Sequence, residues 1–140
     1  MALLPKIFKY KKKMRSPIST SISTRKKRGL GAFSIIATSA ARVTDRELSA
    51  FRKNQKKQIK PYGGRIKCTS KLTVPVSGKS MGSRMGRGKG KVQFHSCFIK
   101  EGNIVFNIYC KDYEKATQAI AKSNFKLSFP TIIGLRAKCF

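Results

Sequence analysis

Glycine and basic residues nearly alternate in residues 81–91, which read MGSRMGRGKGK. Each glycine lacks a side chain, so its backbone can approach a ligand closely or take a positive φ angle. Each arginine or lysine adds a cation, and the planar fork of arginine suits phosphate oxygens. No acidic residue balances this charge, whereas an ordinary solvated loop mixes the two signs. The pattern therefore favours a loop that enters a polyanion over a flexible solvated loop.

The charge of the whole chain indicates the same chemistry. Its 140 residues contain 32 lysines and arginines against five acidic residues, which gives a net charge of +27. A free globular protein with this charge would repel itself, so compensating anions are expected in its working state. Nucleic acid, with about one charge per 1.7 Å of duplex axis, is the natural supplier. An anionic membrane is the alternative, but the nearly uncharged stretch at 29–41 is shorter than the about 20 residues that span a bilayer.

Residues that could support catalysis are scarce. The single histidine, His95, and the five acidic residues, most of which lie near helix starts or in a turn, form no acid–base pair. Residues 86–90 carry glycine at alternate positions but lead into a predicted strand, whereas nucleotide-binding glycine loops lead into a helix. The sequence therefore predicts no enzyme activity, no cofactor and no small-molecule substrate.

The four cysteines also lack a metal-binding pattern. They are far apart and never form a C-x-x-C pair, and one histidine does not complete a zinc site with them. We interpret them as reduced, mostly buried small hydrophobic residues, and we predict no metal site. They are Cys68, Cys97, Cys110 and Cys139.

Residues 1–31 form a predicted basic arm, with ten lysines and arginines and no acidic residue. Their composition, including a Ser/Thr-rich stretch at 16–24, buries little surface, so a partner should order them. The same composition also fits a mitochondrial presequence, and composition alone does not separate the two interpretations. The basic residues of the arm that are expected to bind RNA include Lys11, Lys12, Lys13, Arg15, Arg25, Lys26, Lys27 and Arg28.

A helix is predicted over 45–59, within a single domain that covers 32–140. Thr44 and Glu47 form a capping box, in which each side chain satisfies a free backbone amide at the helix start. Leu48, Phe51 and Gln55 give the helix a narrow inner stripe. Its other faces carry mostly bases, which favours phosphate contact over a merely solvated surface. These bases are Arg46, Arg52, Lys53, Lys56 and Lys57.

The rest of the chain has the patterns of several strands and one more helix. Pro75 should end the second of these strands, and Asp112 should cap the helix. Pro130 is the residue at which the last strand could be interrupted. The expected order is strands over 65–69 and 71–76, the basic loop over 77–91, a hairpin of 92–99 with 104–110, a helix over 112–123 and a strand over 125–133.

The hairpin defines the expected sheet. Its first strand should carry four residues on one face, and its second should direct three residues inward. This order of elements predicts an α+β fold, with two helices on one face of a mainly antiparallel sheet. The residues of the two faces are Val92, Phe94, Ser96 and Phe98, and Ile104, Phe106 and Ile108.

Several segments resemble the bacterial-type large-subunit ribosomal protein sixteen family. The opening Leu3-Leu-Pro-Lys6, the following Lys9-Tyr-x-Lys12 and Phe33 fit the family pattern, as do residues 42–47 and the basic helix. Residues 83–92, SRMGRGKGKV, look like its Arg-Met-Gly-Lys-Gly-Lys-Gly signature, and a strand follows in both. Residues 102–108 and the second helix extend the match over nearly the whole chain.

The resemblance implies a fold of the α/β hammerhead type and a place in the large ribosomal subunit. The implied partners are large-subunit ribosomal RNA, transfer RNA in the aminoacyl site and neighbouring ribosomal proteins, with no membrane. Carried onto matching residues, the resemblance implies that Lys6, Lys9, Tyr10 and Lys12 belong to an arm buried in ribosomal RNA. The loop would face transfer RNA and the peptidyl transferase centre through Lys79, Arg84, Met85, Gly86, Arg87, Gly88, Lys89, Gly90 and Lys91.

Departures from the family pattern bear on the source of the chain. Arg87 replaces the usual lysine, and residues 16–28 are longer and richer in Ser and Thr than a bacterial arm. The divergent composition, rich in Lys, Ile, Ser and Phe, suits an AT-rich organelle genome. Because the family opening begins almost at Met1, we expect an organelle-encoded mitochondrial ribosomal protein rather than a cleaved presequence. The alternative function is a free RNA chaperone or a non-specific nucleic-acid-binding protein.

Overall fold

The computed structural model describes residues 4–5, 10–14, 16–19, 21–22, 33–86, 88–110 and 112–135. Its helices and strands form an α+β fold, as the sequence predicted. Their order is β1 (Phe33–Ala37), β2 (Ala41–Thr44), α1 (Asp45–Ile59), the 3-10 helix η1 (Lys60–Tyr62), β3 (Arg65–Cys68), β4 (Val74–Gly78), β5 (Lys91–Ile99), β6 (Ile104–Tyr109), α2 (Tyr113–Asn124) and β7 (Thr131–Leu135).

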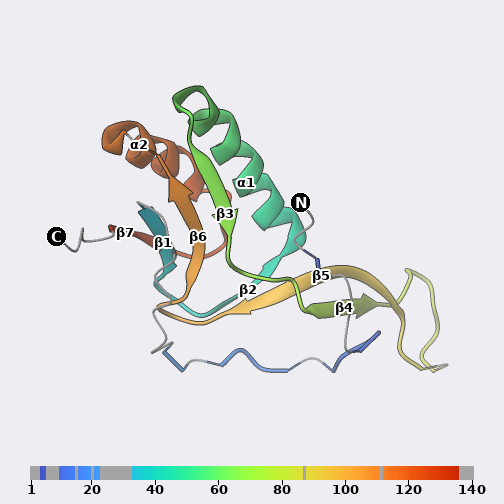
Figure 1. Cartoon of the computed structure of the whole chain (residues 1–140). Helices are drawn as coiled ribbons and strands as arrows, with labels where there is room; N and C mark the ends of the chain where they lie inside the picture. The colour runs from blue at the N-terminus through green and yellow to red at the C-terminus, as the bar shows by residue number, and fades with distance from the viewer. Residues whose placement is uncertain are drawn as a thin grey trace.

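The strands form two antiparallel sheets, whereas the sequence predicted one (Figure 1). The four-stranded sheet has the order β3-β6-β1-β7, and the three-stranded sheet has the order β2-β5-β4. Sequence analysis did not predict β1 or β2. Each strand nevertheless completes a sheet. β1 lies inside the four-stranded sheet and pairs with β6 and β7, and β2 forms an edge of the other sheet and pairs with β5.

The predicted hairpin of 92–99 with 104–110 is wrong. β5 pairs with β2 and β4, and β6 pairs with β1 and β3, so the two strands belong to different sheets. Ala37, the last residue of β1, hydrogen-bonds to the turn that connects β5 to β6. The amide of Ala37 donates to the carbonyl of Asn103 (3.0 Å), and the amide of Gly102 donates to the carbonyl of Ala37 (2.8 Å). Alternating hydrophobicity indicates a strand but does not choose its partner.

Two strand boundaries also differ from the prediction, and both involve proline. β4 begins at Val74 and continues through Pro75, which is tolerated because β4 is an edge strand of its sheet. β7 begins after Pro130, so most of the predicted strand over 125–133 is not a strand. Leu127 and Phe129 of that segment are still buried in the core.

The helix α1 forms where the sequence predicted it. The Thr44 hydroxyl accepts a bond from the Glu47 amide (3.4 Å), so Thr44 caps the helix as predicted. The Glu47 carboxylate accepts from the Thr44 hydroxyl (2.8 Å) rather than from the backbone amide that the predicted capping box would use. Gly63, with a φ of 65°, ends η1 in the left-handed conformation that favours glycine. The inner stripe is confirmed and is one residue longer than predicted; it comprises Leu48, Phe51, Gln55 and Ile59.

The start of α2 differs from the prediction in one respect. Asp112 precedes the helix, but its side chain makes no capping bond. Its carboxylate instead pairs with the ammonium of Lys115 at 3.3 Å, one turn into the helix. Ala116 and Ile120 of α2 are buried in the core.

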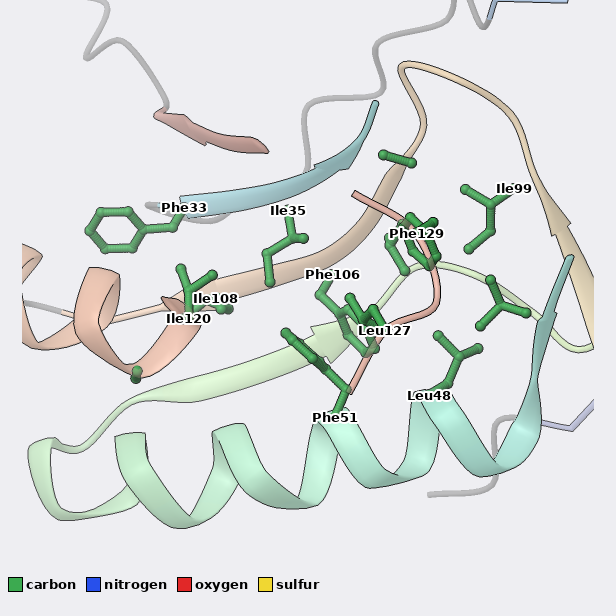
Figure 2. Packing of buried hydrophobic residues seen from close by; sticks show 14 of the residues in the cluster. Phe33, Ile35, Leu48, Phe51, Ile99, Phe106, Ile108, Ile120, Leu127 and Phe129 are labelled. Carbon is green, nitrogen blue, oxygen red and sulfur yellow. The ribbon is translucent and has the colours of Figure 1, made fainter. Parts of the chain in front are cut away.

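A hydrophobic core lies between the four-stranded sheet and the two helices (Figure 2). The rings of Phe51 on α1 and Phe106 on β6 stack with their centroids 4.7 Å apart. The buried side chain of Gln55 donates from Nε2 to the carbonyl of Ala119 at 2.8 Å, which ties α1 to α2. Ile99, the last residue of β5, also belongs to the core, so the core packs against the C-terminal end of this strand.

Candidate nucleic-acid interface

The basic loop connects β4 to β5 over residues 79–90. The two strands pair antiparallel as far as Gly78 and Lys91, so three residues of the predicted 77–91 loop belong to strands. The loop projects from the end of the three-stranded sheet, away from both helices (Figure 1). The rigid sheet therefore holds the loop out from the body of the protein.

Glycine shapes this loop in two ways. Gly82, Gly86 and Gly88 have φ angles of 80°, 110° and 75°, in the region that side chains rarely adopt. Gly90 has a different role at the neck of the loop, where a Cβ atom would collide with the carbonyl oxygen of Gly78. The two strands of the neck thus approach each other closely only because residue 90 has no side chain.

Hydrogen bonds inside the loop fold it back on itself. The Lys79 ammonium donates to the carbonyl of Gly86 at 3.0 Å, and the hydroxyls of Ser80 and Ser83 lie 2.6 Å apart. The loop encloses an open hollow of about 850 Å³, with Arg84 among its lining residues. This arrangement gives the loop a defined concave surface on which several cations converge.

The loop cations face solvent. Lys79, Arg84, Lys89 and Lys91 are all exposed, and the Met85 side chain is fully exposed. Like charges so close together give a strong local positive potential, because water and salt only partly screen them. Arg87, the other predicted cation of the loop, lies outside the described residues.

Part of the predicted arm lies beside the neck of the loop. The Lys12 ammonium donates to the carbonyl of Lys89 at 2.7 Å, and the Lys89 ammonium donates to the carbonyl of Lys13. Further along, the Lys100 ammonium donates to the Ser21 hydroxyl at 2.8 Å. The described arm segments therefore run along the three-stranded sheet (Figure 1). The structure thus brings together arm and loop residues that are 77 positions apart.

The described arm residues present their side chains to solvent. Tyr10, Lys11, Lys12 and Lys13 are exposed, and they were all predicted to bind RNA. The other predicted arm contacts lie outside the described residues. These are Lys6, Lys9, Arg15, Arg25, Lys26, Lys27 and Arg28.

The bases of α1 form a second cationic surface. At 3.6 residues per turn, one narrow arc of α1 on the side opposite the buried stripe carries Arg46, Lys53 and Lys57. Lys60, the first residue of η1, continues this arc. All four are exposed, as is Lys56 beside them. Sequence analysis missed Lys60, although its spacing continues the series. The other predicted base of the helix, Arg52, is only half-exposed. The loop projects away from the helices, so the predicted RNA contacts divide between two surfaces.

Three of the five acidic side chains make contacts within the domain. Asp45 accepts a bond from the Ser49 hydroxyl at 3.1 Å, and Glu47 accepts one from the Ser128 hydroxyl at 2.6 Å. Asp112 forms the ion pair described above. The sequence has no acidic residue in the loop or in the arm. The cations there consequently lack a compensating carboxylate on either segment.

The described cysteines are buried or half-buried. Cys68, Cys97 and Cys110 are free thiols, and Cys139 lies outside the described residues. Burial raises the pKa of Cys97 to about 12 and that of Cys68 to about 11. Within the described ranges, no group of three or more His, Cys, Asp or Glu side chains could hold a metal ion. No helix in this part of the chain has the length and apolar character needed to cross a membrane.

A basic and aromatic contact on the three-stranded sheet was not predicted from the sequence. Arg42 on β2 stands directly opposite Phe98 on β5, and its guanidinium carbon lies 5.8 Å from the ring centroid. The Arg42 Nε donates to the Ser96 hydroxyl at 3.2 Å. Alternation along Arg42–Thr44 could have placed Arg42 on a strand face. The pairing of that strand with β5 has no signal in the sequence.

The chain is similar to known proteins over most of its length. Residues 5–134 match the family described as "Ribosomal protein L16p/L10e". The chain is 38% identical over 106 residues to large ribosomal subunit protein uL16 of Acinetobacter baylyi, which covers 76% of this chain and 77% of that protein. It is 33% identical over 129 residues to uL16 of Chelativorans sp., with 92% and 93% covered. Similarity to uL16 of Leptospira biflexa has the same extent at 30% identity.

The fold and surface are those of a strongly basic α+β protein with a projecting glycine-rich loop. The family match includes both sheets, both helices and this loop. The chain belongs to the ribosomal protein L16p/L10e family. This confirms the family that the sequence motifs indicated.

Proposed function

We propose that the protein is a structural constituent of the large ribosomal subunit and binds large-subunit ribosomal RNA. The observation that carries this proposal is the exposed basic loop on β4 and β5, joined to the arm through Lys12 and Lys89. Its family and the large-subunit names of its relatives support the same function. A net charge of +27 also favours a polyanionic partner, because bound anions would reduce the repulsion among the cations of the protein.

The proposed mechanism is binding and positioning, without a chemical reaction. Lysine and arginine side chains displace counterions from RNA phosphates, and these contacts fix the protein without reading base sequence. The logarithm of the association constant then falls with the logarithm of salt concentration by about 0.9 per phosphate, so about ten contacts give a slope of about −9. The two sheets and two helices act as a rigid wedge between RNA helices.

A finer proposal concerns the loop. We assign its tip, residues 84–90, to the neighbourhood of aminoacyl-site transfer RNA and the peptidyl transferase centre. Cations at this point would reduce the repulsion between transfer RNA and ribosomal RNA phosphates. The positive-φ glycines support this assignment, because they leave the backbone slim enough to enter a crowded RNA site.

Particles that carry Arg84→Ala with Arg87→Ala test the loop assignment. They should retain the protein but bind aminoacyl-site transfer RNA more weakly than unmodified particles. Lys122→Ala with Lys126→Ala removes the same charge at and beyond the end of α2, and should leave this binding unchanged. Normal transfer RNA binding by the loop variant would contradict the loop assignment alone.

Sedimentation tests the more general proposal. In a sucrose gradient, the chain should migrate with large ribosomal subunits and be nearly absent from the soluble fractions. A large soluble pool would instead indicate a free RNA chaperone or a non-specific nucleic-acid-binding protein. This measurement is independent of the loop, so it separates the two levels of the proposal.

We further propose that this subunit is mitochondrial and that the organelle encodes the chain. The support is its composition, which is rich in Lys, Ile, Ser and Phe and poor in acidic residues. The relatives named above are bacterial, so they bear on the family and not on the compartment. Isolated mitochondria should synthesise the radiolabelled chain when cytosolic translation is blocked. Synthesis only in the cytosol would contradict the organelle gene.

A further inference from the structure

A pocket of about 450 Å³ lies between the described arm and the three-stranded sheet. Phe94 and Phe98 on β5 and Arg42 on β2 line it from the sheet. Lys13 of the arm and Lys89 of the loop line it from the other side. The pocket therefore combines two aromatic rings with three cations, and no described lining residue is acidic.

The strand β5 explains why aromatic rings remain at this surface. Alternation puts Cys97 and Ile99 on the face that packs into the core, where both are buried. Phe94 and Phe98 lie on the opposite face and are only half-buried. Ser96 stands between them with a short side chain. At about 3.3 Å per residue, the two phenylalanines are about 13 Å apart along the strand, which leaves room for a planar group beside either ring.

Arg42 has a fixed position in this pocket. Its Nε donates to the Ser96 hydroxyl, and its guanidinium group lies over the Phe98 ring. The hydroxyl in turn donates to the carbonyl of Val74 (3.4 Å), so the whole contact is anchored to the sheet. A guanidinium held in this way offers a flat face for stacking and terminal amino groups for a phosphate.

The arm borders the pocket without filling it. Met14 is among the lining residues, but its side chain is 81% exposed. The bond from the Lys89 ammonium to the carbonyl of Lys13 joins two of the lining residues across the pocket. An occupant would thus contact aromatic surface and positive charge together.

We infer that this pocket binds a single unpaired nucleotide of RNA, with its base against the phenylalanine face and its phosphate toward Lys89 and Arg42. Unpaired bases are the parts of RNA that proteins recognise by stacking on aromatic rings and arginine planes. The charge of the lining residues matches a nucleotide and opposes an apolar or cationic ligand. The inference rests on the proposed RNA-binding function and adds a specific unpaired base to it.

The test uses the full-length protein and two RNA hairpins, identical except that one carries a single bulged uridine. Wild-type protein should bind the bulged hairpin about tenfold more tightly, as expected for one base–aromatic stack. Phe94→Leu with Phe98→Leu keeps apolar side chains but removes the rings, so this preference should disappear. Binding to the unbulged hairpin and its salt dependence should not change, because no cation is lost.

Phe125→Leu is the matched control, since Phe125 is an exposed phenylalanine outside the pocket. It should keep the full preference for the bulged hairpin. Arg42→Lys keeps the charge and removes the flat guanidinium, so it should reduce the preference. A 5-iodouridine at the bulge, irradiated with the wild-type protein, should crosslink to Phe94 or Phe98, which gives a reading that needs no variant.

The outcomes separate this inference from the proposed function. Equal and tight binding of both hairpins by the wild type would overturn the pocket and leave RNA binding intact. A preference that survives in the leucine double variant, or a crosslink outside β5, would also overturn the pocket. Failure to bind either hairpin would overturn the proposed RNA-binding function together with the pocket.

Discussion

Lys12 and Lys89 join the basic arm to the basic loop, although both carry positive charge. The Lys12 ammonium donates to the carbonyl of Lys89 at 2.7 Å, and the Lys89 ammonium donates to the carbonyl of Lys13. Backbone oxygens are thus the acceptors, and two like charges lie close together without a carboxylate between them. A polyanion bound across this contact would reduce the repulsion, so we expect the arm and the loop to be joined more stably when bound than when free.

Lys89→Met should release the arm, because it removes the ammonium that bonds to Lys13. Amide hydrogen exchange at residues 10–14 should become faster, as measured by mass spectrometry of the whole protein. Lys91→Met is the control: it removes the same charge from an exposed neighbour in β5 and should leave this exchange unchanged. Each variant should lower the magnitude of the salt slope for RNA by about 0.9 where the lysine meets one phosphate. Equal exchange in the two variants would contradict the tether.

The exposed face of α1 is expected to contribute phosphate contacts independently of the loop. Lys53→Gln with Lys57→Gln should reduce the magnitude of the salt slope for RNA binding by about 1.8, at unchanged helix content. Lys122→Gln with Lys126→Gln removes the same net charge at and beyond the C-terminal end of α2. A salt titration of each variant measures the slopes. The same reduction in both pairs would mean that only net charge matters and that α1 has no special role.

Thr44→Ala should destabilise the protein by about 1 kcal/mol, because the first turn of α1 loses its capping bond. The loss also frees the Glu47 carboxylate from its bond with the Thr44 hydroxyl. Thr44→Ser keeps a hydroxyl at this position and should lie close to the wild type. Urea unfolding followed by circular dichroism measures the difference. Equal midpoints for the alanine and serine variants would show that the cap contributes little.

Two buried thiols should make the protein less stable in alkali. Burial raises the pKa of Cys97 to about 12 and that of Cys68 to about 11, from an ordinary value of 9.0. Above about pH 9 the unfolded thiols ionise while the folded ones stay protonated, so the free energy of unfolding falls as pH rises toward 11. Below pH 9 the thiols are protonated in both states, so they cause no loss of stability there.

Unfolding by urea at about pH 8 and about pH 10 measures this effect, which should be smaller in Cys97→Val than in the wild type. Lysine ionisation is common to both proteins and cancels in the comparison. Iodoacetamide at about pH 8 should alkylate Cys97 much more slowly in the folded protein than in urea, since the thiolate is the reactive form. Rapid alkylation of folded Cys97 would contradict its protonated, buried state.

The parts of the fold that were predicted correctly depend on neighbours in sequence. The N-cap at Thr44 and the stripe of α1 are local patterns, because each helical hydrogen bond joins residues four apart. The loop was recognised from alternating glycine and charge, which is also a local feature. The division into an arm up to residue 31 and a domain beyond it stays a prediction.

The charge of the protein, its first helix and the chemistry of its loop follow from the order of its residues. The folded chain was needed to show that β5 and β6 belong to different sheets, that Arg42 faces Phe98 and that Lys12 contacts Lys89. The physical reason is that a strand satisfies its backbone hydrogen bonds with a partner that can lie anywhere in the chain. Contacts across strands and between segments therefore depend on how the whole core packs, which local patterns do not specify.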